Sequence, residues 1–153
     1  HLAGVNSINW ARVMAQVVYY VVATDLLATP LNVCVPSGNF GNVFSGWIAR
    51  RMGAPIDQLL VASNANDILE RFFNRNDMST APVVPSLSPS MDIQVSSNFE
   101  RLLFEMNGRD GGQTAEQLQQ FRASGRLSVE TDQRAEFLDG RCRLAAAYHR
   151  DRT

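Results

Sequence analysis

The sequence predicts an α/β fold with three layers, a parallel sheet and a mainly helical C-terminal third. Two strand-and-helix units carry this prediction. An apolar run at 31–36 precedes a helical pattern at 43–52, and a second run at 58–62 precedes a helical pattern at 68–74. Strands that alternate with helices form right-handed parallel crossovers, because only that hand packs the helix back onto the sheet. The third observation is that residues 108–153 have a mostly helical pattern, which we assign to the same fold.

The central stretch of the chain is LNVCVPSGNFGNVFSGWIARRMG, residues 31–53. Its apolar beginning reads as a buried strand, so that Cys34 is expected to be a packing residue. A glycine-rich turn follows, and the next helix ends at Gly53, since glycine commonly terminates helices. In this order of strand, turn and helix, free backbone N–H groups and a helix N-terminus face the same point, which favours phosphate binding.

The turn at 37–42 is therefore the candidate phosphate site, although such turns also occur without ligands in other α/β domains. Gly38 and Gly41 are able to adopt positive φ and leave room for close approach of a ligand. We expect the ring of Phe40 to pack beneath the loop. The G-x-x-x-x-G-K-[ST] spacing and the three-glycine dinucleotide spacing are both absent, so a small phosphate compound is expected. The candidate residues are Ser37, Gly38, Asn39, Phe40, Gly41 and Asn42.

Helix-capping patterns predict where four helices begin. Asn6 or Ser7 caps a helix that runs to Leu27, and Asn66 or Asp67 caps the helix that starts at Ile68. Two further starts have the capping-box spacing. They are Ser97 with Glu100 and Thr114 with Gln117, and the helix that starts at Thr114 is expected to end at Gly125. The helix after Ser97 is expected to face the core with Phe99, Leu102, Leu103 and Met106, and an alternative role for its Arg101 is to hold a substrate or a neighbouring carboxylate. Short helices are also expected at 131–138 and 142–148.

Composition excludes several classes of function. The chain has 153 residues, a net charge of −1 and 45% hydrophobic residues, which argues for a globular domain without electrostatic attraction to nucleic acid or to a membrane surface. Cys34 and Cys142 are far apart, as are His1 and His149, so that we expect no disulfide and no metal site. The apolar run at 13–28 is too short and polar for a membrane span, and with no signal peptide we expect a cytoplasmic protein.

The turn and its surroundings resemble one known family. Val35–Asn42 (VPSGNFGN) is similar to the phosphate loop of the threonine synthases, which are pyridoxal 5'-phosphate (PLP) enzymes of the tryptophan-synthase-β fold. The resemblance covers roughly residues 4–104 and weakens after Gly108. It is carried also by Asn6–Arg12 (NSINWAR), Met52–Ile56 (MGAPI), Ala62–Asp67 (ASNAND), Leu87–Ile93 (LSPSMDI) and Ser97–Arg101 (SNFER).

The resemblance implies a function for these residues. Threonine synthases convert O-phospho-L-homoserine and water to L-threonine and phosphate. Residues 37–42 would bind the phosphate of PLP. Residues 1–107 would be part of the PLP-binding α/β domain and residues 108–153 a helical segment of the same fold, in a possible homo-oligomer. Asn6, Ser7, Asn9 and Arg12 would lie near the substrate phosphate.

One absence limits this interpretation. All fourteen basic residues are arginines, whereas PLP enzymes hold their cofactor as a Schiff base with a lysine. Arginine cannot replace that amine, because its guanidinium stays protonated. We therefore assign no catalytic residue and expect an internal or C-terminal fragment of a threonine synthase that is inactive alone. The alternatives are a non-covalent phosphate- or nucleotide-binding module and an inert structural fragment.

Overall fold

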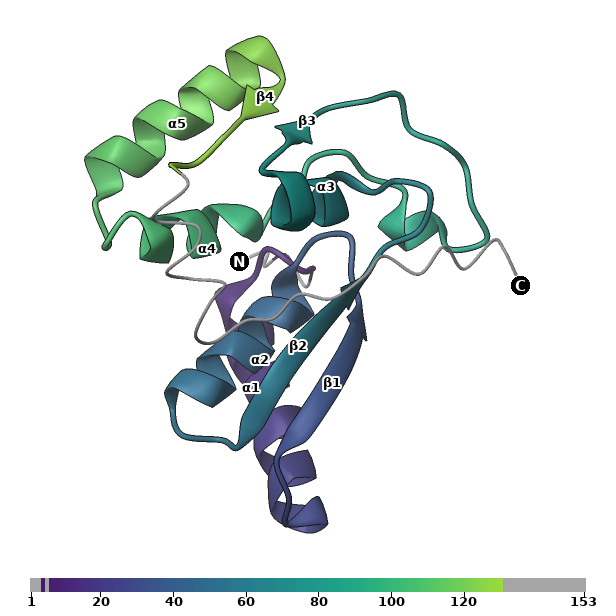
Figure 1. Ribbon diagram of the computed structural model, residues 1–153, viewed down its shortest axis with the longest axis vertical. Coiled ribbons are helices and arrows are strands. Elements are labelled where there is room, and N and C mark those ends of the chain that lie inside the picture. The colour runs from purple at the N-terminus through teal and green to yellow at the C-terminus, as the bar shows by residue number, and fades with distance from the viewer. Residues whose placement is uncertain (1–3, 5, 131–153) are drawn as a thin grey trace.

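The computed structural model describes residue 4 and residues 6–130. Figure 1 shows α1, α2, β1 and β2 grouped together, with α3, α4 and α5 beyond the tips of the two strands. The order of strand and helix predicted for residues 31–74 is confirmed. In chain order, the elements are α1 (Trp10–Leu27), β1 (Leu31–Pro36), α2 (Gly41–Arg51), β2 (Ile56–Ala62), α3 (Ile68–Arg75), β3 (Met78–Ser79), the 3-10 helix η1 (Pro89–Met91), α4 (Phe99–Met106), α5 (Gly111–Ser124) and β4 (Arg126–Leu127).

Strands β1 and β2 are parallel neighbours, and α2 connects them. The register pairs Cys34 with Leu60 and Pro36 with Ala62, so both strands end at the same edge. Side chains in β1 alternate between the covered and the open side: Val35 is buried, whereas Cys34 is exposed. The expectation of a buried strand with Cys34 as a packing residue was therefore wrong. A strand covered on one side buries only every second side chain, because neighbouring side chains point to opposite faces.

Helix α1 packs closely against α2. Gly46 makes this approach possible, since a Cβ atom there would lie 2.7 Å from Cε1 of Tyr20. The hydroxyl of Ser45 donates to the carbonyl oxygen of Val13, which ties the two helices together at 2.8 Å. Tyr20 also donates its hydroxyl to the carbonyl oxygen of Asn42 at 2.9 Å. The packing of α1 thus positions the first turn of α2.

An aromatic cluster joins the turn after β1 to α3 and α4. The ring centroids of Phe72 and Phe99 lie 4.6 Å apart, and Phe40 from the turn stacks on Phe73 at 5.8 Å. Each ring contributes about 1.5–3 kcal/mol by leaving water. The core-facing stripe predicted for α4 is confirmed, because all four of its residues are buried: Phe99, Leu102, Leu103 and Met106.

The predicted start of the N-terminal helix was three residues early. Asn9 caps α1, since its Oδ1 accepts a hydrogen bond from the N–H of Ala11 at 2.9 Å. Asn6 instead accepts from the N–H of Ile8, which forms a separate turn before the helix. The end at Leu27 is confirmed.

The cap position predicted for α3 is confirmed, since the helix starts at Ile68 and Asp67 is its N-cap residue, although Asp67 makes no capping hydrogen bond. Its carboxylate pairs with Arg71 instead, at 2.9 Å. The capping boxes predicted for α4 and α5 were wrong, and α4 has no side-chain cap. Helix α5 begins at Gly111, three residues before Thr114, and Asp110 caps it by accepting from the N–H of Gln113.

The end predicted for α5 at Gly125 is confirmed, and the chain then enters a small ribbon. Gly125 has a φ of 68°, and β4 pairs with β3 in antiparallel fashion. The helices expected at 131–138 and 142–148 lie outside the described residues. Within the described part of the chain, no helix is both long and apolar enough to cross a lipid bilayer.

Candidate phosphate-binding site

The turn at 37–42 lies at the tips of both parallel strands. The N–H of Ser37 donates to the carbonyl oxygen of Ala62 at 3.0 Å, which continues the pairing of β1 and β2 by one residue. The hydroxyl of Ser37 in turn accepts from the N–H of Phe40. Helix α2 starts directly afterwards at Gly41. Ligands of open parallel sheets bind at this edge, beyond the carboxyl ends of the strands.

The backbone of the turn is shaped by Phe40. This residue has a φ of 64° and its side chain is only 2% exposed. A left-handed conformation costs a non-glycine residue about 1–2 kcal/mol, and burial of the ring among aromatic neighbours offsets that cost. The expectation that the ring packs beneath the loop is confirmed. Gly38 and Gly41 do not use the positive φ that glycine is able to adopt.

Five backbone N–H groups of this segment donate to no described protein atom, although Gly41 and Val43 are buried residues. No residue in the described part of the chain accepts a hydrogen bond from the backbone N–H of Gly38, Asn39, Gly41, Asn42 or Val43. The last three belong to the first turn of α2, which has no side-chain cap. Uncapped N–H groups at a helix N-terminus carry a partial positive charge and bind anions. The hydrogen-bonding pattern of this segment therefore supports its assignment as the candidate phosphate site.

The two glycines of the turn make room for other parts of the chain. A Cβ atom on Gly38 would lie 3.0 Å from Cα of Met91, and one on Gly41 would lie 3.1 Å from Nδ2 of Asn98. Close approach by the backbone of Met91 and by the side chain of Asn98 therefore accounts for the two glycines, where the sequence suggested close approach by a ligand. The segment that crosses the loop at 91–98 was not expected to touch it.

Asn98 holds the turn against the start of the chain. It is fully buried, and both its N–H and its Nδ2 donate to the carbonyl oxygen of Asn39, each at 3.1 Å. Nδ2 also donates to the carbonyl oxygen of Ser7 at 2.8 Å. Ser97 adds a bond from its hydroxyl to Oδ1 of Asn39. This bond is why Ser97 does not form the capping box expected with Glu100.

Arg101 completes the connection between α4 and the N-terminal segment. Its Nη2 donates to the carbonyl oxygen of Ile8 at 2.8 Å, and its Nε donates to Oδ1 of Asn98. The guanidinium lies 4.9 Å from the ring centroid of Trp10, which is cation–π distance. These contacts occupy donors of Arg101. The alternative role, in which Arg101 binds a substrate carboxylate, therefore has less support.

The four residues expected near the substrate fall into two groups. Asn6, Ser7 and Asn9 use their groups to shape the segment before α1: Asn6 and Asn9 accept from nearby N–H groups, and Ser7 accepts from Asn98. Arg12, in the first turn of α1, is exposed, and its side chain makes no hydrogen bond or ion pair with any described residue. Its guanidinium is therefore free to bind an anion, while the other three position the backbone beside the turn.

Two features near the turn had no sequence signal strong enough to identify them. Ser63, directly after β2, is 3% exposed, and its buried hydroxyl has no partner among the described residues. A buried polar group without a partner is rare and marks a site where a ligand or water is expected. Ser63 follows Ala62, which pairs with Ser37, so its hydroxyl belongs to the same edge of the sheet.

The second feature is a polar cluster around Asp92. Its carboxylate accepts from the hydroxyl of Ser86 and from Nδ2 of Asn64, both at 2.6 Å. Asn66 joins by donating to Asp92 and to the carbonyl oxygen of Val84, which explains why it does not cap α3. The hydrogen bond from Ser86 holds the pKa of the Asp92 carboxyl below its usual value. The cluster fixes the segment that lies against Gly38.

Comparison with known proteins gives a consistent result. No protein-family model matches the chain. The chain is 58% identical to the threonine synthase of Pseudomonas aeruginosa over 136 residues, which covers 87% of this chain and 29% of that protein. It is 39% identical to the threonine synthase of Saccharomyces cerevisiae, over 85% of this chain and 28% of that one. The chain thus spans about three tenths of the length of the curated relatives it matches.

Solved structures agree with the sequence comparison. A PLP-bound threonine synthase from Brucella melitensis superposes with a TM-score of 0.88 and 45% identity, over 97% of this chain and 32% of that one. The yeast threonine synthase superposes with a TM-score of 0.82 and 36% identity, over 94% of this chain and 30% of that one. This agreement confirms the fold class predicted from the sequence.

Proposed function

Because the chain belongs to the threonine synthase family, we propose that the enzyme it contributes to converts O-phospho-L-homoserine and water to L-threonine and phosphate. Such an enzyme is a carbon–oxygen lyase that acts on a phosphate ester and uses PLP. When bound, PLP would supply an electron sink for negative charge that develops on substrate carbon atoms. We place the enzyme in the cytoplasm, as expected for amino-acid biosynthesis.

In this proposal, residues 37–42 bind the phosphate group of the cofactor. The observation that supports it is the set of N–H groups without partners among the described residues: those of Gly38 and Asn39 in the turn, and those of Gly41, Asn42 and Val43 at the start of α2. Hydrogen bonds to a charged group contribute about 1.5–3 kcal/mol each, and the helix N-terminus adds to them. Ser63 offers a further donor at the same edge. A phosphate dianion fits this set without a charged side chain.

The residues of this chain hold the cofactor and do not attach it. The sequence has no lysine, so the amine that attaches PLP has to come from outside these 153 residues. The chain alone is expected to bind phosphate compounds weakly and to have no activity. Residues 1–107 are assigned to the PLP-binding domain and residues 108–153 to a helical segment of the same fold.

We assign the substrate phosphate to the N-terminal end of α1. Arg12 would bind it as a charged donor, since guanidinium groups match phosphate geometry. Asn6, Ser7 and Asn9 would fix the segment that carries it, through the bonds they form with Ile8, Asn98 and Ala11. A homo-oligomer is also proposed, since each strand of the described parallel sheet has one unpaired edge.

The sharpest test is Asn42→Asp, which adds one negative charge and keeps the shape of the side chain. Oδ1 of Asn42 accepts from Tyr20, and a carboxylate retains that role. A carboxylate in the first helical turn should stabilise the fold by about 0.3–1 kcal/mol, yet it should repel a phosphate. We expect higher thermal stability together with weaker binding of PLP and of inorganic phosphate, measured by calorimetry and phosphorus NMR.

Asn32→Asp is the matched control, because Asn32 is exposed in the middle of β1. It should leave phosphate binding unchanged. The loop is not the phosphate site if Asn42→Asp binds both compounds as tightly as the unmodified chain. A general folding defect in Asn42→Asp would lower both thermal stability and phosphate affinity. A specific loss of binding would lower the affinity alone.

A further inference from the structure

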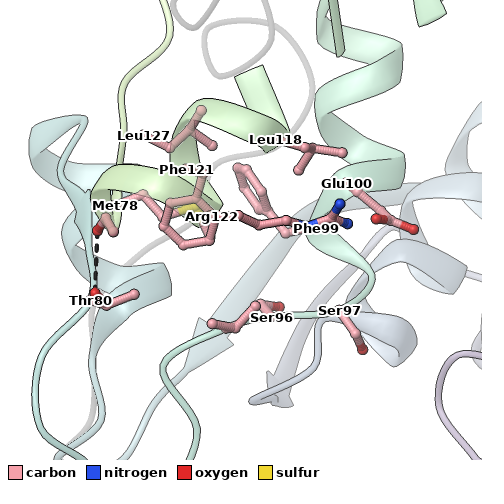
Figure 2. Close-up of a pocket in the computed structure, with 12 residues that line it drawn as sticks. Met78, Thr80, Ser96, Ser97, Phe99, Glu100, Leu118, Phe121, Arg122 and Leu127 are labelled. Atoms are coloured by element: carbon pink, nitrogen blue, oxygen red, sulfur yellow. Dashed lines mark hydrogen bonds between the residues drawn. The ribbon is translucent and has the colours of Figure 1, made fainter. Parts of the chain in front are cut away.

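A cavity lies between α4, α5 and the ribbon of β3 and β4, and two of its lining residues, Ser97 and Phe99, also contact the turn. Its volume is about 330 Å³, which is at the lower end of the range of about 300–1,000 Å³ for small-molecule sites. Figure 2 shows the side chains around it. The apolar part of the wall consists of Met78, Val95, Phe99, Leu118, Phe121 and Leu127.

Two opposite charges stand at this cavity, one from each helix. Glu100 belongs to α4 and Arg122 to α5, and both are exposed. Figure 2 shows the side chain of Arg122 extending toward Glu100. In the described part of the chain, neither side chain makes a hydrogen bond or an ion pair with another residue. One cationic and one anionic group therefore line the same, partly apolar space.

A buried hydroxyl without a partner lines the same cavity. Ser96 is 6% exposed, and its Oγ is buried without a hydrogen-bond partner among the described residues. Leaving such a group unpaired costs about 1–3 kcal/mol, which a polar atom of a bound molecule would recover. This observation is independent of the two charges and points to a ligand with a polar group.

We propose that this cavity binds an α-amino acid with an apolar side chain. Its carboxylate would pair with Arg122 and its ammonium group with Glu100, while the side chain enters the space between Phe99 and Phe121. A simple carboxylic acid has no ammonium group to pair with Glu100, so its negative charge would be repelled by that side chain. A simple amine has no carboxylate to pair with Arg122, so its positive charge would be repelled there.

The test is a titration of the purified chain with L-leucine, followed by amide NMR and calorimetry. We expect signals of residues around the cavity, such as Ser96 and Leu127, to shift at millimolar ligand. Two analogues lack one charge each: 4-methylpentanoate has no ammonium group and 3-methylbutylamine has no carboxylate. Each should bind about tenfold more weakly or worse, the effect of losing one charge-assisted hydrogen bond.

Variants separate specific binding from general association. Arg122→Gln and Glu100→Gln change exposed side chains and should each weaken L-leucine by about tenfold. Leu118→Phe should block the cavity and abolish binding. Arg126→Gln is the control, since Arg126 is exposed and does not line the cavity. The proposal is wrong if L-leucine causes no shifts at the cavity, if 4-methylpentanoate binds equally well, or if the charge variants bind like the unmodified chain.

Discussion

Nδ2 of Asn98 lies 2.8 Å from the carbonyl oxygen of Ser7, although 91 positions separate them in the sequence. The same side chain also contacts the carbonyl oxygen of Asn39 in the turn after β1. One buried amide therefore sets the distance between the proposed cofactor end and the proposed substrate end of the site.

Asn98→Ala should loosen both ends at once. The carbonyl oxygen of Ser7 would lose its donor, whereas that of Asn39 would keep the N–H of residue 98. Leaving a buried carbonyl unpaired costs about 1–3 kcal/mol, so that urea unfolding should occur at clearly lower denaturant. Hydrogen exchange of residues 6–9 should accelerate in the same variant. Asn74→Ala changes an exposed asparagine and should have a small effect. Unchanged exchange at residues 6–9 in Asn98→Ala would show that the side chain does not restrain this segment.

Tyr20→Phe tests how α1 supports the first turn of α2. Burial raises the pKa of the Tyr20 hydroxyl far above its ordinary value, so it stays protonated and donates to Asn42. Loss of that hydrogen bond should cost about 0.5–1.5 kcal/mol in the free energy of unfolding. Tyr19→Phe, at an exposed neighbouring position, should be neutral. Equal stability of the two variants would contradict a supporting role for the Tyr20 hydroxyl.

Gly38→Ala tests whether the glycines serve chain packing. The added Cβ would lie 3.0 Å from Cα of Met91, a backbone atom that cannot turn away. Such overpacking should destabilise the fold by about 1–3 kcal/mol even without any ligand. Gly111→Ala is the counterpart, since nothing lies within 4 Å of its Cβ, and it should stabilise by about 0.4–1 kcal/mol. If Gly38→Ala has normal stability, chain packing does not account for the glycine at this position, and close approach of a ligand becomes the explanation.

The Asp92 cluster predicts a specific pH dependence. Its folded-state pKa is lowered by Ser86 and Asn64, so its contribution is present above the ordinary carboxyl value of about 3.9 and is lost as the pH falls through the lowered value. Urea midpoints of the unmodified chain should therefore fall below about pH 4. Asp92→Asn should be less stable at neutral pH and should show a shallower decline in acid. If the urea midpoints of the unmodified chain and of Asp92→Asn fall equally with decreasing pH, Asp92 does not make this contribution.

Local sequence patterns were sufficient for the elements around the site. The apolar run, the glycine-rich turn and the helical spacing after it predicted β1 and α2 almost to the residue, because each signal acts over a few neighbouring positions. Leu27 and Gly125 were likewise recognised as helix ends from residues beside them.

The capping predictions failed because polar side chains found partners far along the chain. Ser97 bonds to Asn39, 58 positions away, and Asn66 bonds to Val84. The hydroxyl of Thr114 accepts a hydrogen bond from Nδ2 of Asn107. Thr114 itself lies inside α5, three residues after the helix begins at Gly111. A pattern of four residues cannot reveal that a distant backbone competes for the same hydroxyl or amide. The site residues Ser63 and Asp92 were missed for the same reason, since their role depends on tertiary contacts.

The left-handed backbone of Phe40 has a consequence for assembly. That conformation persists because α3 and α4, which are made of residues later in the chain, enclose the ring. A synthetic peptide of residues 31–53 would lack this enclosure and would relax to an ordinary turn with its N–H groups pointing elsewhere. Affinity for phosphate should consequently emerge only late in folding, after the aromatic rings have come together.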